Sequence, residues 1–292
     1  MMQVTFLGLG DIGSPMAARL AARFRLTVWN RTAGRATEFG RVHRATVAPT
    51  ASDAVRGSAI VASCLSTSAD VDAVVTAALP GLARDQIWID FTSGDPATSR
   101  RIAARLADVG VCFLDAPVSG GTAGAAQGTL TIMVGGDAAT LDVTRAVFDT
   151  VGKKIVHCGP VGAGDAVKAV NNALLAVNLW STVEGLVTLA KAGVAPSVAL
   201  DVINASSGRS NASMTLIPER VLTRAFPRTF RLALLDKDVG IAASVARDNR
   251  VASPLLQEIA ELVRVARAEL GEEADHAELA KVIERWAGVE LT

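Results

Sequence analysis

The sequence predicts an α/β protein in which a doubly wound, mostly parallel sheet is followed by an all-helical C-terminal domain. Three observations lead to this fold class. Short apolar runs alternate with helical patterns in the first half of the chain, a glycine-rich turn follows the first run, and the second half has the spacing of helices throughout. Alternating strands and helices are typical of a parallel sheet covered by helices on both faces.

The predicted strands are short apolar runs. They lie at residues 4–7, 26–29, 59–62, 87–89 and 111–114, and residues 129–134 and 155–156 are expected to form late edge strands of the same sheet. The first helix is predicted over residues 16–24, because Met16, Leu20 and Phe24 recur at the i, i+4, i+8 spacing of one helix face.

The second half of the chain is predicted to be helical. Residues 165–192 contain no proline and one glycine, which predicts one helix long enough to form the spine of a domain. Its polar residues, Lys168 and Glu184 among them, argue against a membrane span. Further helices are predicted over residues 196–204, 216–224, 232–248 and 254–270. The boundary is placed in the glycine-rich segment 159–164, which gives domains of residues 1–161 and 162–292.

The composition excludes several classes of protein. The 29 Lys and Arg residues balance 29 Asp and Glu residues, whereas a nucleic-acid binder normally shows a basic excess. Cys64, Cys112 and Cys158 lie far apart without C-x-x-C pairing, which predicts reduced thiols in a cytoplasmic protein, with neither a disulfide framework nor a zinc site. The N-terminus lacks the charged region and cleavage site of a signal peptide.

The composition also restricts the possible chemistry. The chain contains no tyrosine, which excludes a tyrosine-dependent reductase mechanism. His43, His157 and His276 lie outside any motif, so we expect surface or structural roles for them. A proton-transfer group in this chain is therefore expected to be another residue type.

The strongest local motif follows the first predicted strand. Its sequence matches G-x-G-x-x-G and consists of Gly8, Leu9, Gly10, Asp11, Ile12 and Gly13. A strand before it and a helix after it are the context in which this pattern binds a dinucleotide pyrophosphate. The first glycine allows the tight turn, the second allows close approach of the phosphates, and the third allows helix–strand packing. The phosphates would then lie at the N-terminus of the helix.

The end of the second predicted strand indicates which dinucleotide binds. An NAD site usually has an acidic residue there, which holds the ribose hydroxyls. This chain has Asn30, Arg31 and Thr32 instead, with Arg35 one turn later. Asn30 brings no charge that would repel a 2′-phosphate, and Arg31 offers a bidentate cation. The sequence therefore favours NADP over NAD.

Two further segments carry groups suited to catalysis. Ser119, Gly120 and Gly121 follow an apolar strand and offer a hydroxyl and consecutive backbone N–H groups, a small anion-binding nest. Lys168 and Asn172 are four residues apart on the predicted long helix, so they share one face. On spacing alone, a glycine-rich linker and a surface lysine remain possible alternatives.

These motifs together resemble the β-hydroxyacid dehydrogenase family, and 3-hydroxyisobutyrate dehydrogenases most strongly. The resemblance runs essentially end to end and rests on GLGDIGSPMA, DFTSGDP, DAPVSGGTAGAAQGTLTIMVGG, GAGDAVKAVNN, LLDKDVGIA, INASSGRSNA and VLTRAFPRTF. It implies an N-terminal Rossmann domain, a helical C-terminal domain with a cleft between them, and reversible oxidation of a short 3-hydroxy acid to its semialdehyde.

The resemblance also implies roles for individual residues. Lys168 matches the catalytic lysine, and Asn172 matches an amide that orients the substrate. Ser119, Gly120 and Gly121 match the loop that binds the substrate carboxylate.

Three further matches concern the cofactor side of the site. Lys237 matches a lysine that closes over cofactor and substrate, Leu65 and Ser66 fall in the loop on the nicotinamide side, and Ser93 matches a hydroxyl residue that contacts the cofactor. Two departures stand out. Ser66 replaces the family's usual proline, and the order Thr92-Ser93 leaves open which hydroxyl reaches the ligand.

Several functions remain compatible with the sequence. The leading one is NADP-dependent oxidation of 3-hydroxyisobutyrate, as in valine catabolism. Reduction of glyoxylate or succinic semialdehyde on the same fold is an alternative, and a cofactor-binding scaffold without catalysis is another. Imine reductases share the architecture but usually lack the lysine that Lys168 supplies. No metal, nucleic-acid or membrane partner is expected, and the apolar helical domain predicts a homodimer or homotetramer.

Overall fold

The computed structural model describes residues 2–292, which form two compact units. Unit 1 ends at Lys168 and unit 2 is Ala169–Thr292, so the division falls inside a long helix, α8 (Ala163–Lys191). The boundary predicted from the sequence, after residue 161, lies just before this helix.

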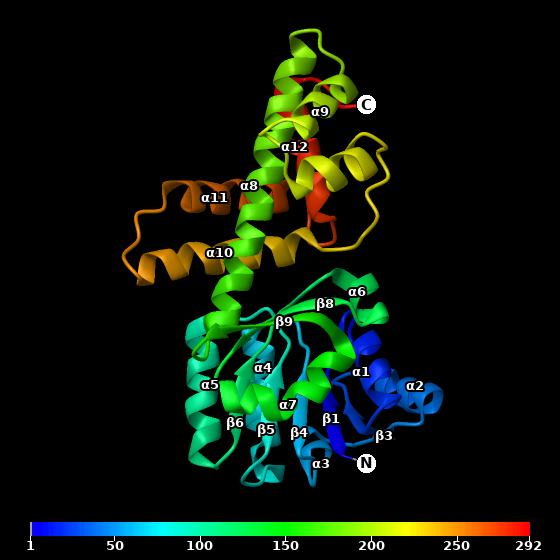
Figure 1. Ribbon diagram of the computed structural model, residues 1–292. Coiled ribbons are helices and arrows are strands. Elements are labelled where there is room, and N and C mark those ends of the chain that lie inside the picture. Colours follow the sequence, from blue (N-terminus) through cyan, green and yellow to red (C-terminus); the bar gives the residue numbers. More distant parts are fainter. Residues whose placement is uncertain (1) are drawn as a thin grey trace. The chain divides into compact units, whose positions relative to one another are not determined.

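Unit 1 is built on one twisted sheet (Figure 1). The strand order is β3-β2-β1-β4-β5-β6-β8-β7, and β9 pairs with β8. The strands are β1 (Gln3–Leu7), β2 (Arg25–Trp29), β3 (Thr46–Val47), β4 (Ile60–Ser63), β5 (Ile87–Asp90), β6 (Cys112–Asp115), β7 (Val118–Ser119), β8 (Leu130–Gly135) and β9 (Gly152–Gly159). Neighbouring strands from β3 to β6 run parallel, as predicted.

The sheet differs from the prediction at one end. The run at 129–134 is not an edge strand, because β8 pairs with β6, β7 and β9, and it runs antiparallel to β6 and β7. The two-residue strands β3 and β7 were not predicted, since runs that short leave no periodic signal.

The helices of unit 1 cover both faces of the sheet. They are α1 (Gly13–Ala21), α2 (Ala33–His43), α3 (Ala51–Val55), α4 (Ser68–Ala78), η1 (Leu79–Gly81), α5 (Pro96–Asp108), α6 (Gly121–Gln127) and α7 (Ala138–Val151). Successive strand side chains point to opposite faces, so Phe6 and Ile89 join a core with α1, α2 and α7, while Leu7 and Trp88 join a core with α3, α4 and α5. Strands that are buried on both faces appear in the sequence as continuous apolar runs.

Helix α1 begins and ends three residues earlier than predicted. Its anchors Met16, Leu20 and Phe24 are buried as expected, but the helix starts at Gly13, directly after the glycine turn. It ends at Ala21 because the chain must reverse before β2 begins at Arg25.

Unit 2 is helical, as predicted, with α8 running through its core (Figure 1). Its other helices are α9 (Pro196–Ala205), η2 (Ala212–Val221), α10 (Leu232–Asp248), α11 (Pro254–Leu270), η3 (His276–Leu279) and α12 (Ala280–Ala287). By length and apolar composition α8 would qualify as a membrane span, but its buried face, from Ala169 to Val187, belongs to the core of unit 2.

Two helical segments of unit 2 depart from the prediction. The helix expected at 216–224 lies earlier and is a π-helix, η2, with Pro218 inside it. A proline has no N–H to donate, and such a residue favours a locally altered hydrogen-bond pattern. The segment η3–α12 was not predicted, although Asp275 and Glu278 form a capping box at its start, a signal that the sequence does carry.

Candidate active site

The glycine turn lies at the carboxyl end of β1, between β2 and β4. This is the point where the strand order reverses, and doubly wound sheets bind their ligands there. Gly8 has φ +100°, and a Cβ on it would lie 2.3 Å from the carbonyl oxygen of Cys64. A Cβ on Gly13 would lie 2.2 Å from the carbonyl oxygen of Gly8. Both positions therefore require glycine, Gly8 for the turn to pack against the segment after β4 and Gly13 for helix α1 to pack against the turn.

Gly10 is different, because its neighbourhood is open. A Cβ built there meets no protein atom within 4 Å. Asp11 and Ile12 complete the turn, and Ile12, the N-cap residue of α1, supplies no side-chain hydrogen bond to the first helical turn. An open space beside a glycine and a helix N-terminus whose first N–H groups have no side-chain cap fits a dinucleotide pyrophosphate.

Asn30 connects the glycine turn to the end of β2. Its Oδ1 accepts a hydrogen bond from the Leu9 N–H at 2.9 Å, and its Nδ2 donates to the Thr32 carbonyl at 3.0 Å. Arg31 is 84% exposed in its side chain and forms an ion pair with Asp70. Thr32 is the N-cap residue of α2. The residues predicted to select the cofactor thus lie together beside the turn.

The carboxyl ends of β4 and β5 share a buried polar network. The Leu65 N–H donates to Thr92 Oγ1 at 2.9 Å, and Thr92 Oγ1 donates to Asp90 Oδ1 at 2.7 Å. Ser63 Oγ donates to the same Asp90 oxygen at 2.8 Å. Burial raises the pKa of Asp90 to about 6, although the Thr92 and Ser63 hydrogen bonds oppose the shift.

This network distinguishes Thr92 from Ser93, the two adjacent hydroxyl residues between which the sequence did not decide. Thr92 is buried and its hydroxyl serves the internal network, while Ser93 is partly exposed. Ser66, one residue after Leu65, is exposed. Of Thr92 and Ser93, Ser93 is therefore the more accessible residue.

Two buried carboxylates that the sequence analysis did not assign hold the start of α8. Asp115 accepts hydrogen bonds from the N–H groups of Gly162 at 2.7 Å and Asp165 at 3.0 Å. Asp165 accepts from the Gly94 N–H at 2.9 Å and from Ser99 Oγ at 2.6 Å. They tie the loops that carry Ser93 and Ser119 to the helical turn before Lys168.

The pKa values of both carboxyls reflect this burial. Burial raises the pKa of Asp115, while backbone N–H groups, that of Gly162 first, oppose the rise. Burial, and then the charge of Asp115, raises the pKa of Asp165 well above its usual range. Acidic residues are almost never fully buried unless they are paired. An Asp at the end of an apolar strand, such as Asp115, is therefore the sequence signal that could have identified a buried, partnered carboxylate.

The predicted carboxylate loop has the backbone that its sequence requires. Ser119 ends β7 and pairs in register with Thr131. Gly120 and Gly121 follow with φ +132° and +62°, a backbone region that other residues rarely adopt. Both glycines are exposed at the start of α6. Their N–H groups lie in a chain reversal of the kind that binds anions.

Lys168 and Asn172 occupy one buried face of α8, as the four-residue spacing predicts. They are 9% and 3% exposed. The Asn172 Nδ2 donates to Asp238 Oδ2 at 2.6 Å, and Lys237 Nζ lies 3.0 Å from Asp238 Oδ1. Asp238, on α10, therefore joins two predicted site residues of unit 2. Lys237 was predicted from the sequence, whereas the neighbouring Asp238 was not.

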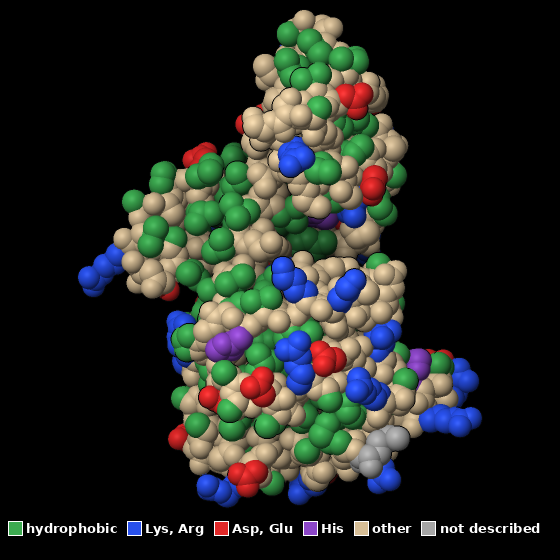
Figure 2. All heavy atoms as spheres, viewed as in Figure 1, with side chains coloured by type: hydrophobic (Ala, Val, Ile, Leu, Met, Phe, Trp, Pro, Cys, Tyr) green, Lys and Arg blue, Asp and Glu red, His purple; other side chains and the backbone are tan. Residues whose placement is uncertain are grey.

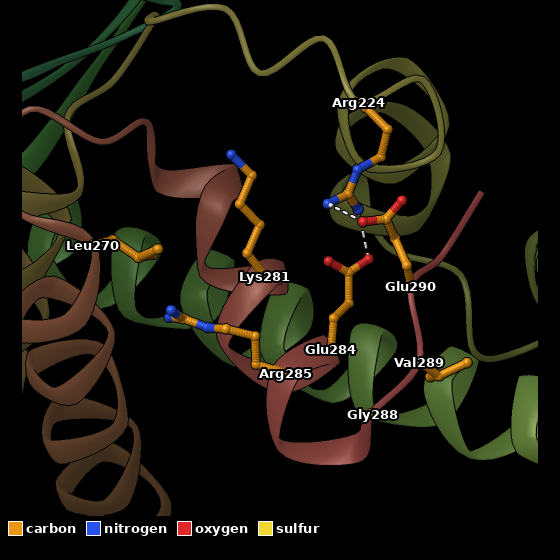
Figure 3. Close-up of a pocket in the computed structure, with 8 residues that line it drawn as sticks. All are labelled: Arg224, Leu270, Lys281, Glu284, Arg285, Gly288, Val289 and Glu290. Atoms are coloured by element: carbon orange, nitrogen blue, oxygen red, sulfur yellow. Dashed lines mark hydrogen bonds and ion pairs between the residues drawn. The ribbon is translucent and has the colours of Figure 1, made fainter.

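A pocket lies elsewhere in unit 2 (Figure 3). It encloses about 470 Å³ and is lined by Arg224, Leu270, Lys281, Glu284, Arg285, Gly288, Val289 and Glu290. Arg224 contacts Glu284 at 2.6 Å and Glu290 at 3.5 Å, so charges of opposite sign meet inside it. No predicted site residue lines this cavity.

Two of the histidines contact backbone carbonyl groups, and His43 is exposed. His157 Nε2 lies 2.8 Å from the Gly136 carbonyl oxygen, and the buried His276 contacts the Phe230 carbonyl. Among residues 2–292, no group of three or more His, Cys, Asp or Glu side chains is arranged to hold a metal ion.

Comparisons with known proteins agree with this architecture. Residues 3–159 match the NAD binding domain of 6-phosphogluconate dehydrogenase, and residues 162–283 match the family described as NAD-binding of NADP-dependent 3-hydroxyisobutyrate dehydrogenase. The chain is 33% identical to 2-(hydroxymethyl)glutarate dehydrogenase of Eubacterium barkeri, over 100% of this chain and 98% of that one. It is 35% identical to NAD-dependent L-serine dehydrogenase of Pseudomonas aeruginosa, over 87% and 89%.

A solved structure is also closely similar. The 3-hydroxyisobutyrate dehydrogenase of Mycobacterium tuberculosis, determined with L-serine, superposes with a TM-score of 0.91 at 31% identity and covers 97% of this chain and 99% of its own. Both family matches, the full-length relatives and this structure point the same way. The chain belongs to the 3-hydroxyisobutyrate dehydrogenase family of NAD(P)-dependent β-hydroxyacid dehydrogenases.

Proposed function

We propose that this protein is a cytoplasmic enzyme that oxidises a short 3-hydroxy acid reversibly with NADP, and that 3-hydroxyisobutyrate, which yields methylmalonate semialdehyde, is its leading substrate. The observation that carries this proposal is the pair Lys168 and Asn172 on one buried face of α8, in a chain of this family. A buried lysine beside a buried amide is the residue set needed to move a proton and to orient a hydroxyl.

The proposed roles follow from the chemistry of each group. A nicotinamide dinucleotide held at the glycine turn would supply the hydride acceptor for the carbon that carries the hydroxyl. Lys168 accepts the hydroxyl proton as the C=O bond forms and returns it in the reverse direction. Asn172 orients the hydroxyl, and Asp238 holds the Asn172 amide through its 2.6 Å hydrogen bond. Ser119 and the N–H groups of Gly120 and Gly121 bind the carboxylate.

The preference for NADP rests on the end of β2. The Asn30 amide carries no charge and already accepts the Leu9 N–H, so no acid is present there to hold the ribose hydroxyls. Arg31 is exposed and directly follows Asn30, which is hydrogen-bonded to the turn, so its guanidinium is the cation proposed to bind a 2′-phosphate. One relative is named as NAD-dependent, so both cofactors belong in any assay.

The substrate proposal can be tested with a small panel. The names of the relatives give three compounds that share the unit HOCH2–CH(R)–COO⁻, where R is methyl, ammonium or a propionate chain. We expect the protein to oxidise compounds that contain this unit, and to do so faster with NADP⁺ than with NAD⁺. Among the three compounds, 3-hydroxyisobutyrate should have the highest kcat/KM. Turnover of glyoxylate or succinic semialdehyde alone would assign the reductase function instead, and no turnover of any compound would support a non-catalytic scaffold.

The proposed oligomer depends on which apolar side chains of unit 2 are exposed. The apolar residues of α8, such as Leu179, Trp180 and Val183, are buried inside unit 2 itself, so they leave no surface for a partner. Other apolar side chains of unit 2 are exposed, including Leu174, Val198, Val202, Met214 and Leu255. Figure 2 shows hydrophobic side chains on the part of unit 2 that holds α10 and α11.

We expect unit 2 to form a homodimer or homotetramer through such exposed apolar side chains, because burying them removes apolar area from water. Sedimentation at micromolar concentration should show a species of at least twice the 30.2 kDa chain mass. A species of the chain mass alone would contradict this expectation.

A further inference from the structure

An ion pair joins the two segments that flank the glycine turn. Arg31 Nη1 lies 3.0 Å from Asp70 Oδ1. Arg31 follows β2, and Asp70 lies in the first turn of α4, which follows β4. Since β1 lies between β2 and β4 in the sheet, the pair connects the strand ends on either side of the turn that would hold a dinucleotide.

The two partners differ in how firmly they are held. Thr67 Oγ1 donates to Asp70 Oδ2 at 2.8 Å, and the Asp70 backbone N–H donates to Thr67 Oγ1 at 3.1 Å. The Asp70 side chain is 27% exposed, whereas that of Arg31 is 84% exposed. Asp70 is therefore the fixed partner, and Arg31 is the long side chain that can move to another anion.

We propose that Asp70 is a specificity-determining residue that competes with a 2′-phosphate for Arg31 and so lowers the preference of this protein for NADP over NAD. The proposal rests on the proposed function only in requiring that a dinucleotide binds at the glycine turn. When NADP binds, Arg31 must leave Asp70 or hold carboxylate and phosphate at once, which brings like charges together. NAD has no 2′-phosphate, so the competition does not affect it.

The test is Asp70→Asn, which removes the charge and keeps the local structure. An asparagine oxygen can still accept the Thr67 hydroxyl, and the backbone bond to Thr67 is unaffected. Dissociation constants of NADPH and NADH are measured by fluorescence of the bound nicotinamide at low ionic strength, where screening is weakest. We expect NADPH to bind about threefold to fivefold more tightly, the range of an exposed ion pair, and NADH to change by less than twofold.

Asp72→Asn is the matched control. Asp72 lies on the same helix, two residues further on, and pairs with Arg105 at 2.8 Å instead of Arg31. The variant makes the same change in net charge and should leave the ratio of the NADPH and NADH dissociation constants unchanged. An equal gain in both variants would show a general charge effect and would overturn the proposal.

A double-mutant cycle assigns the effect to Arg31. In an Arg31→Ala background, Asp70→Asn should change NADPH binding by less than twofold, because the cation for which the anions compete is gone. Weaker NADPH binding in Asp70→Asn would mean that Asp70 orients Arg31 for the phosphate, and an unchanged ratio would mean that the ion pair plays no part. Either result overturns this proposal, while failure of the unsubstituted protein to bind both dinucleotides would overturn the proposed function itself.

Discussion

Replacing Lys168 by alanine is expected to lower the rate of hydride transfer by roughly 10²–10⁴-fold, the usual contribution of general acid–base catalysis. The affinity for NADPH should stay nearly unchanged, because the groups proposed to hold the dinucleotide lie at the glycine turn and at Arg31. The measurement is single-turnover hydride transfer, followed by nicotinamide absorbance, together with a direct binding titration.

Two companion variants distinguish proton transfer from positioning. Lys168→Arg should also lower the rate of hydride transfer, because a guanidinium does not lose its proton at accessible pH. Asn172→Ala should cost less, because an amide orients the substrate without moving the proton. Its hydrogen bond to Asp238 predicts that Asp238→Ala acts in the same direction as Asn172→Ala.

Lys237 provides the critical comparison. It lies on α10, 3.0 Å from Asp238, and also resembles a site lysine of the family. If Lys168→Ala keeps near-normal rates while Lys237→Ala loses them, the catalytic role belongs to Lys237.

Alanine substitutions at Gly8 and Gly10 are expected to give different defects, a loss of stability at Gly8 and a loss of dinucleotide affinity at Gly10. At Gly8 a Cβ would meet the Cys64 carbonyl oxygen at 2.3 Å, and φ is +100°. Steric overlap and backbone strain together should lower the free energy of unfolding by about 2–5 kcal/mol. Denaturant unfolding of the protein without cofactor measures this loss.

At Gly10 the defect should appear in binding. Since a Cβ there meets no protein atom within 4 Å, Gly10→Ala should change the free energy of unfolding by less than about 0.5 kcal/mol. The new methyl group would occupy space that the pyrophosphate needs, so the dissociation constant of NADPH should rise about tenfold or more. Normal dinucleotide affinity in Gly10→Ala would show that the phosphates do not approach this turn.

Local sequence patterns predicted much of this architecture. The apolar runs of β1, β2, β4, β5 and β6 read as buried parallel strands because both faces of each are covered. The glycine turn was readable because Gly8 and Gly13 occupy positions where any side chain would overlap backbone. That Lys168 and Asn172 share one face of α8 followed from helical periodicity alone, whereas the burial of that face did not.

Other features became visible only when distant segments were brought together. Asp90, Asp115 and Asp165 each looked like an ordinary acid at a strand or helix end, and their burial depends on loops folded against them from elsewhere in the chain. The same is true of Asp238, whose partner Asn172 lies 66 residues away.

Sequence patterns of two to four residues predict turns, strands and helix faces, because those depend on backbone sterics and on local periodicity. Ion pairs and buried carboxylates depend on which segments pack together, and periodicity carries no information about that. Arg31 illustrates the difference. Its residue type and its place after β2 suggested a phosphate ligand, but its partner Asp70, 39 residues later, was decided by the sheet order that sets β4 beside β1.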